Sequence, residues 1–364
     1  MRVLIVGGGI AGLSTAWALA RGGHESQVLE QGPVPNPMGS SVDEHRMTRF
    51  FYPEPSGYAA MVESARAAYD ALWRDLGETF YRETGILGLS RDAGDWIDRS
   101  MPGIEAQGLE HQRLTPDEVA KRWPFVEPAG VAYGVLMRKG GVLFASRIVA
   151  ALARKLGSAV RANTQVVAID PGRASATLAD GTIVSGDALV VCAGPWIGRL
   201  VPALAPRAQS YRQVSLYLDA PARFRSVWDE APAIVDFGGE GDIYAFPSVD
   251  GTRIKVASGE YRRRQEPDRE RDVRAGEPAD ILARYRGRLV DIDAYRVLEA
   301  RSCCYTMTAD SRFTTAQLSP RAIAVSACSG HGFKFGAVVG SKIADTVTGK
   351  LAFDDFARWV SGRG

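Results

Sequence analysis

The strongest constraint on the fold is a glycine pattern in RVLIVGGGIAGLSTAWALARGGHESQVLEQ, residues 2–31. A β-branched run, Val3 to Val6, predicts a buried strand, and a helical pattern follows through Ala20. Gly7, Gly9 and Gly12 lie between them in G-x-G-x-x-G spacing. One glycine permits the tight turn, one lets the backbone approach a pyrophosphate, and one lets the helix pack on the strand. Because the helix N-terminus also presents free N–H groups to phosphates, we expect a bound dinucleotide.

The same stretch supplies an acid at the expected distance. SQVLE predicts a second strand that ends at Glu30, which lies 18 residues beyond Gly12. That spacing is close to the roughly 20 residues at which an acid binds a ribose hydroxyl. A glycine-rich turn without a ligand is the alternative interpretation. The motif alone does not decide between FAD and NAD.

The residues that follow do not continue as further βα units, as an NAD-binding sheet would require. Residues 31–55 form a long loop with two arginines, and helices such as MVESARAAYDALWRDLG (61–77) come next. Residues 140–157 predict a turn and an amphipathic helix. After them, short strands flank an Asp180-Gly181 hairpin turn, and an apolar strand runs from Leu189 to Cys192.

Two further patterns occur in the chain after residue 210. Residues 211–260 read as antiparallel strands joined by Gly-rich and Asp250-Gly251 turns, and residues 322–349 read as strand, glycine-rich loop and helix. We therefore expect an α/β protein in which a Rossmann-like nucleotide-binding domain is interleaved with an α+β substrate domain on an antiparallel sheet. The expected segments are 1–80, 140–205 and 305–364 for the first domain, and 81–139 and 206–304 for the second.

Composition excludes some partners. The 44 basic and 42 acidic residues give a net charge of +2, so no overall field favours nucleic acid or a membrane surface. The densest basic run, YRRRQEPDRERDVR (261–274), contains acids and is expected to be a solvated helical face. The apolar start contains glycines and lacks a small-residue cleavage site, so we expect a cytoplasmic protein. Four cysteines are too few and too uneven for a disulfide scaffold.

Several spaced motifs occur together in one order. They are GGGIAGLSTAWALA (7–20), GSSVDEHRMTRFFY (39–52), GGVLF (140–144), YRQV (211–214), YAFPS (244–248) with Lys255 eight residues after its proline, CCYT (303–306) and SGHGFKF (329–335). In these motifs, and over nearly its whole length, the chain resembles the D-amino-acid oxidase superfamily. Within it, the similarity is to the monomeric sarcosine oxidase and N-methyltryptophan oxidase family. The resemblance implies FAD rather than NAD, and a monomer.

The resemblance also implies roles for the paired cysteines. In that family a cysteine two residues before a tyrosine forms a thioether to the 8α-methyl of FAD. The matching residue is Cys303, with Tyr305 after it, and Cys304 is then a packed neighbour. Two buried thiols or a vicinal disulfide are the alternatives. A thioether at this position would hold the flavin ring and raise its redox potential.

Further roles are carried over in the same way. Arg49 and Lys334 would bind the substrate carboxylate, which a guanidinium can match with two hydrogen bonds, and Arg46 would lie near the flavin. Two surface arginines are the alternative. Lys255 would activate oxygen, because a fixed cation stabilises superoxide, whereas an exposed strand lysine is the ordinary interpretation. Tyr244 and Tyr305 would form aromatic walls of the substrate site.

The remaining residues of the expected site would contact FAD. His331 is expected to be a flavin contact rather than a base. The complete set of expected cofactor contacts is Gly7, Gly9, Ile10, Ala11, Gly12, Glu30, Gln31, Ser40, Ser41, Arg46, Val167, Ala193, Gly194, Trp196, Cys303, Gly330, His331, Gly332, Phe333 and Lys334.

One departure from the family pattern concerns the substrate. The sarcosine oxidases have a histidine four residues after the lysine, where this chain has Gly259. The missing imidazole puts sarcosine itself in doubt. The room that Gly259 leaves suggests a bulkier or cyclic amino acid.

Together these observations predict an FAD-dependent oxidase of an amino acid with a secondary amine, either N-methyl or cyclic. Hydride transfer to flavin would give an imine, and reoxidation by O₂ would give H₂O₂. No metal is expected, since the histidines and cysteines show no ligand spacing. The alternatives are a dehydrogenase that uses a quinone or protein acceptor, an aromatic hydroxylase, and a non-catalytic flavoprotein that serves as a binding module.

Overall fold

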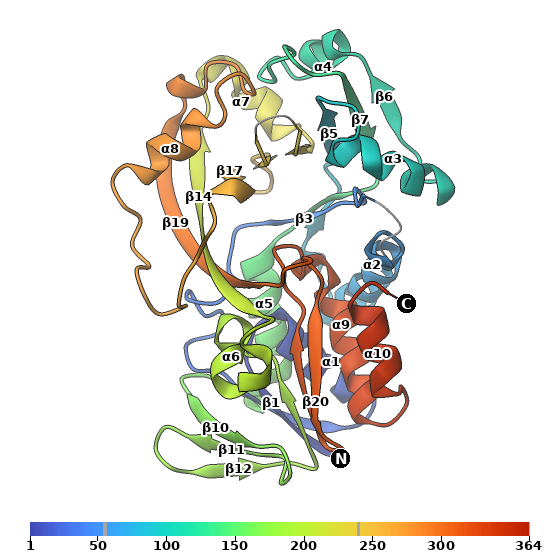
Figure 1. The fold of residues 1–364 in the computed structure, drawn as a ribbon, viewed down its shortest axis with the longest axis vertical. Helices are drawn as coiled ribbons and strands as arrows, with labels where there is room; N and C mark the ends of the chain where they lie inside the picture. The colour runs from blue at the N-terminus through green and yellow to red at the C-terminus, as the bar shows by residue number, and fades with distance from the viewer. Residues whose placement is uncertain (54–56, 239–240, 364) are drawn as a thin grey trace.

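The apolar strand before the glycine-rich turn lies inside a mainly parallel sheet, in the lower lobe of the computed structural model (Figure 1). The structure describes residues 1–53, 57–238 and 241–363. Neighbouring strands run parallel except at the β20–β21 edge, which is antiparallel. The strand order is β20 (Thr314–Ser319), β21 (Ala322–Ser326), β13 (Ala188–Val191), β1 (Arg2–Val6), β2 (Glu25–Leu29) and β9 (Val160–Arg161).

Each face of this sheet is covered by a different layer. Successive residues of a strand point to opposite faces, so Val3 and Ile5 pack on the helices, while Leu4 and Val6 pack on a small antiparallel sheet. The helices are α1 (Ile10–Arg21), α2 (Gly57–Leu76), α5 (Ala145–Leu156), α9 (Gly336–Val347) and α10 (Phe353–Val360). The small sheet consists of β10 (Val166–Asp170), β11 (Ser175–Leu178) and β12 (Ile183–Ser185).

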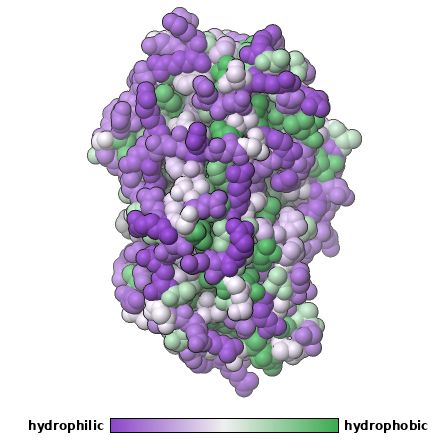
Figure 2. All heavy atoms as spheres, turned by 180° about the vertical axis from the view of Figure 1, so that it is seen from behind, coloured by the Kyte–Doolittle hydropathy of each residue, from purple (hydrophilic) through white to green (hydrophobic). Residues whose placement is uncertain are grey.

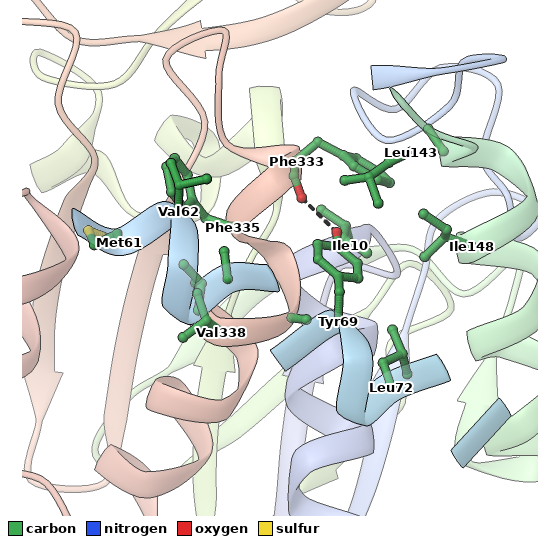
Figure 3. Close-up of a cluster of buried hydrophobic side chains, with 14 of the residues drawn as sticks. Ile10, Met61, Val62, Tyr69, Leu72, Leu143, Ile148, Phe333, Phe335 and Val338 are labelled. Atoms are coloured by element: carbon green, nitrogen blue, oxygen red, sulfur yellow. Dashed lines mark hydrogen bonds between the residues drawn. The ribbon is translucent and has the colours of Figure 1, made fainter. Parts of the chain in front are cut away.

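Two glycines allow α9 to lie directly against α1. A Cβ added to Gly336 would come within 2.3 Å of Ile10, and one added to Gly340 within 2.5 Å of Ser14. Figure 3 shows the apolar cluster beside this contact, where the hydroxyl of Tyr69 in α2 donates to the carbonyl of Phe333 at 2.7 Å. The first and last thirds of the chain therefore share one core, which fixes the loop before α9 close to the glycine-rich turn.

The upper lobe is built on a largely antiparallel sheet, with β5 and β15 as its parallel pair. Its order is β18 (Arg263–Arg264), β14 (Gln209–Asp219), β17 (Ile254–Ser258), β16 (Ile243–Phe246), β15 (Ala233–Asp236), β5 (Ile86–Ser90), β7 (Tyr133–Met137) and β6 (Gln112–Leu114). The helices of this lobe are α3 (Trp96–Ala106), α4 (Pro116–Arg122), α7 (Ala222–Asp229) and α8 (Glu277–Ala283). A small sheet of β3 (Arg46–Thr48), β8 (Gly141–Leu143) and β4 (Tyr81–Arg82) lies between the lobes (Figure 1).

Two long strands run through both lobes. β14 pairs along its whole length with β19 (Arg296–Met307), from Gln209 opposite Met307 to Asp219 opposite Arg296. The register shifts between Tyr217 and Leu218. In Figure 1 this ribbon descends from the upper lobe to the lower one. The expected domain boundary after residue 304 falls inside β19.

The expected fold class is confirmed: a Rossmann-like α/β domain built from separated segments is interleaved with a domain on an antiparallel sheet. The Asp180-Gly181 turn joins β11 to β12 as expected. At the second predicted turn both central residues, Asp250 and Gly251, have positive φ, the conformation that Asp-Gly favours.

One local prediction was wrong. Residues 261–274 do not form a helix but turns around the short strand β18, in which Arg263 and Arg274 both pair with Glu270. Within the described residues, no helix is long and apolar enough to cross a membrane. The face in Figure 2 is mostly hydrophilic, with apolar residues interspersed.

Candidate functional site

The glycine-rich turn is packed so closely that two of its positions exclude any side chain. Gly7 has φ +109°, and a Cβ there would lie 2.3 Å from the carbonyl oxygen of Cys192 at the end of β13. A Cβ on Gly12 would lie 2.0 Å from the Gly7 carbonyl. Substitution at either position would separate the turn from the sheet or from α1.

The acid at the end of β2 is held in a fixed orientation. Glu30 is buried, and its carboxylate accepts hydrogen bonds from the Gly8 amide at 2.7 Å and the Asn36 side chain at 2.8 Å. Beside it, the amide of Ile10 at the start of α1 donates to the Ser41 hydroxyl at 3.0 Å. A carboxylate beside a glycine turn and a helix N-terminus is the donor and acceptor set that a ribose and a pyrophosphate require.

A cavity of roughly 290 Å³ opens at this turn. Of the residues expected to bind the cofactor, those on its wall are Gly7, Gly9, Glu30, Gln31, Ser40, Ser41, Val167, Ala193, Gly194 and Trp196. Gly12 and Ala11 do not line the cavity: the former packs on the turn, and the latter lies within the first turn of α1. The residues present therefore fit a dinucleotide bound across the carboxyl ends of β1 and β13.

A second, larger cavity of roughly 560 Å³ adjoins the first, since Ser40 lines both. It lies between the lobes and contains the other expected residues: Ile10, Arg46, Arg49, Tyr244, Lys255, Cys303, Tyr305, Gly330, His331, Gly332, Phe333 and Lys334. Residues from both ends of the chain, Ile10 and Lys334 among them, thus line one cavity.

Strand alternation separates the two adjacent cysteines. Cys303 and Tyr305 lie on the face of β19 that lines the larger cavity, whereas Cys304 points the other way and is fully buried. The Ser40 hydroxyl donates to the backbone carbonyl of Cys304 at 2.7 Å. Both thiols are free, so the structure contains no vicinal disulfide. Cys303 is therefore the thiol that a ligand in this cavity would meet.

Lys255 is buried and paired with an acid that the sequence did not single out. Its Nζ lies 2.5 Å from the carboxylate of Asp43, which also pairs with Arg46 and accepts a hydrogen bond from the Tyr217 hydroxyl at 2.5 Å. Burial and the charge of Arg46 lower the pKa of Lys255, while the Asp43 carboxylate favours the ammonium form. The cation at this wall is thus compensated from within the protein.

Two further cations of the cavity, Arg49 and Lys334, lack a directly paired carboxylate of this kind in the described part of the chain. Within the described residues, neither Arg49 nor Lys334 forms an ion pair. The Arg49 guanidinium lies over the rings of Tyr52 at 4.6 Å and Trp96 at 5.3 Å. Burial lowers the pKa of both groups. The charge of Arg49 lowers the pKa of Lys334 further, whereas Tyr52 and Asp242 act to raise the pKa of Arg49. Buried charges without a partner are expensive, so this wall favours an anionic ligand.

Hydrogen bonds order the protons around Lys334. Its Nζ donates to the Tyr52 hydroxyl at 3.0 Å, and that hydroxyl lies 3.1 Å from Nδ1 of His331. Burial and the Lys334 charge lower the pKa of His331, which keeps its ring neutral. The Tyr52 proton then points to Nδ1, and Nε2–H donates to the Ser311 carbonyl at 3.0 Å. Both ring nitrogens of His331 are occupied, which agrees with a contact rather than a base.

The space beside Gly259 is not empty. A Cβ on Gly259 would lie 2.0 Å from a carboxylate oxygen of Asp242. The expectation that Gly259 enlarges the substrate site is therefore wrong, because the acidic side chain of the residue before β16 occupies that position. Asp242 was not singled out from the sequence, and only the pairing of two strands reveals it.

The comparisons with known proteins agree with this geometry. The family described as FAD dependent oxidoreductase (DAO) matches residues 2–346. Peroxisomal sarcosine oxidase of Homo sapiens is 28% identical over 352 residues, which cover 93% of this chain and 89% of that protein. N-methyl-L-tryptophan oxidase of Yersinia pestis is 24% identical over 351 residues, 94% of this chain and 93% of the relative. Glycine oxidase from Geobacillus kaustophilus has a similar fold, with a TM-score of 0.83 at 20% identity, covering 100% of this chain and 99% of that one.

Proposed function

The chain belongs to the DAO family of FAD-dependent oxidoreductases, whose members act on amino acids and amines, and we propose that it oxidises an amino acid at the carbon next to a secondary amine. Relatives named for sarcosine and N-methyl-L-tryptophan support an N-methyl or cyclic substrate. When bound, FAD supplies the two-electron acceptor for this reaction and passes the electrons to O₂.

The observation that carries the proposal is a pair of cations at the cavity wall that form no ion pair with any described residue. Arg49 and Lys334 lie in the same cavity and lower the free energy of a bound carboxylate more than that of a neutral amine. Held there, an amino acid has its reacting carbon and amine at a fixed distance from the carboxylate. The two residues therefore orient the substrate as well as bind it.

The tyrosines of the cavity add uncharged aromatic surface beside its charged groups. Burial raises the pKa of Tyr244 and Tyr305, so both stay neutral phenols at physiological pH. Their rings exclude water from the reacting carbon, and their hydroxyls remain donors. A substrate amine in such surroundings loses its proton more readily than in water, and the neutral amine is the form that gives up a hydride equivalent.

We also propose roles for Lys255 and Cys303. The ammonium group of Lys255 would stabilise negative charge as oxygen is reduced, with Asp43 holding it in place. The Cys303 thiol, which faces the larger cavity, would attach FAD covalently. Support for both roles comes from position in the cavity and from the family resemblance.

Anaerobic mixing with a panel of amino acids tests the proposal. The bound flavin should lose its visible absorbance with N-methyl or cyclic amino acids. It should respond weakly to primary amino acids of the same size and to the decarboxylated amines. If no amino acid bleaches the flavin, the protein is a binding module and the proposal fails. If the flavin bleaches but is reoxidised by a quinone and not by O₂, the protein is a dehydrogenase.

A further inference from the structure

The acid beside Gly259 is placed by the register of two strands. Ile243 of β16 pairs with Ser258 of β17, and the Gly259 amide donates to the Asp242 carbonyl at 2.7 Å. Because residue 259 is glycine, the Asp242 carboxylate can occupy the space where a side chain would otherwise begin. One of its oxygens lies 2.0 Å from the position that a Cβ on residue 259 would take. Any larger residue at 259 would move this carboxylate.

The carboxylate faces the cavity. Asp242 immediately precedes β16 and lies two residues before Tyr244, and both line the larger cavity with Arg49. Asp242 interacts electrostatically with Arg49 and with the nearby Arg262. It therefore lies on the wall that a substrate held by Arg49 would meet.

The charges of Arg262 and Arg49 act on this acid only at longer range within the part of the chain that the structure describes. No hydrogen bond or ion pair there involves its carboxylate, whereas Glu260, another acid at the cavity wall, pairs with Arg284. Burial raises the pKa of Asp242. A half-buried anion without a donor is unfavourable, and a bound carboxylate nearby would add repulsion. A ligand that carries a cation as well as a carboxylate would remove both costs.

We propose that Asp242 is a specificity-determining residue that binds a cationic group on the side chain of the substrate, so that the preferred amino acid has a distal ammonium or guanidinium group. This inference rests on the proposed function, because it deepens the substrate class of the same site. The reacting amine is a poor partner for Asp242, since a carboxylate beside it would keep that amine protonated and hold back the hydride. A distal amine or guanidinium remains charged throughout.

Binding of two acids of equal length tests this without turnover. Pentanoate and 5-aminopentanoate both lack an α-amine and differ by a terminal ammonium. Titrated into the flavin-containing protein and followed by flavin absorbance, 5-aminopentanoate should bind at least about tenfold more tightly, roughly 1.4 kcal/mol. Asp242→Asn should abolish the preference, and Gly259→Ala should weaken it by moving the carboxylate. Glu260→Gln, in which a paired acid is neutralised, should retain it. Equal affinities in the wild type, including no detectable binding of either acid, would overturn the proposal.

Turnover provides the second arm. Nα-methyl-lysine should bleach the flavin with a higher kcat/KM than Nα-methylnorleucine, and Asp242→Asn should lower only the former, by roughly tenfold or more. Equal loss with both substrates would mean that Asp242 acts on the reacting amine or on the fold, and would overturn the inference. If neither amino acid bleaches the flavin, the proposed oxidation is wrong for this class, and the binding arm alone decides the role of Asp242.

Discussion

The carboxylate of Asp43 lies 2.5 Å from Nζ of Lys255, although 212 residues separate them in the chain. The pair is buried, and Arg46 binds the same carboxylate. Asp43 therefore compensates two cations at once, which allows Lys255 to remain charged in a cavity wall without a bound anion. Among the described residues, neither Arg49 nor Lys334 forms an ion pair of this kind, so these two cations favour an anionic ligand at their side of the cavity.

Replacement of Lys255 by methionine should separate the two halves of the reaction. We expect reoxidation of the reduced flavin by O₂ to slow by about 100-fold or more, because the fixed positive charge is lost, at about 1.4 kcal/mol per tenfold. Reduction of the flavin by substrate should change far less. Stopped-flow traces of each half-reaction measure this. Asp43→Asn is the companion variant, and equal damage to both half-reactions in Lys255→Met would mean that the ion pair only supports the fold.

Covalent attachment of the flavin to Cys303 can be tested by the colour of the denatured protein. Acid-precipitated wild type should stay yellow, and its denatured gel band should fluoresce under ultraviolet light. Cys303→Ser should release its flavin, whereas Cys304→Ser, altered on the opposite face of the same strand, should retain it. A colourless wild-type pellet would end the hypothesis, and release from the Cys304 variant alone would move the attachment by one residue.

Removal of the Arg49 charge should weaken the binding of amino acids but not of amines that lack a carboxylate. Arg49→Ala should raise KM for amino acids by roughly 10- to 100-fold, since a charged hydrogen bond contributes about 1.5–3 kcal/mol. KM for the matching decarboxylated amines should hardly change, which makes these amines the internal control. Steady-state kinetics on both series measures the difference. Wild-type preference for amines without a carboxylate would show that the two cations have another use.

Stability should fall in mild acid because the folded protein holds two histidines, His45 and His331, in neutral form. Burial lowers the pKa of His45 to about 3, and that of His331 is lowered as well. Between about pH 6.5 and about pH 3 the unfolded chain binds more protons at His45 than the folded protein does. The free energy of unfolding therefore decreases as pH falls through that window, by up to about 1.4 kcal/mol per pH unit.

Urea unfolding at pH 7 and pH 5 measures this effect. The wild type should lose about 2 kcal/mol to His45 between these values. His45→Asn should be less stable at pH 7, since it loses the stacking of His45 on Phe246, but should show a smaller drop on acidification. His24→Asn, at a partly exposed position, is the control and should keep the wild-type drop. An unchanged drop in His45→Asn would contradict the assignment.

Local sequence patterns predicted the parts of this fold that depend on near neighbours. The strand, glycine turn and helix from residue 2 to residue 21 follow from apolar periodicity and from positions that exclude a side chain. The Asp-Gly turns follow from backbone conformation. The prediction of a helix over residues 261–274 was wrong because the arginines there pair with acids in turns and because Pro267 interrupts any helix.

The functional site depends on distant pairings, which is why only family resemblance brought its residues together. Nothing near Asp43 indicates that it will meet Lys255. Asp242 becomes part of the cavity through the register of β16 with β17, and a shift of one residue would turn it away. Nothing in a single sequence indicates that the Asp242 carboxylate will fill the space beside Gly259.

The β14–β19 ribbon has a consequence for how ligands reach the interior. Because one ladder, from Gln209–Met307 to Asp219–Arg296, is common to both lobes, a hinge across it would have to disturb many backbone hydrogen bonds together. The register shift at Tyr217 and Leu218 is the place where the ladder is already interrupted. We therefore expect entry and exit to depend on loops at the cavity mouth, with the two lobes moving as a single body throughout turnover.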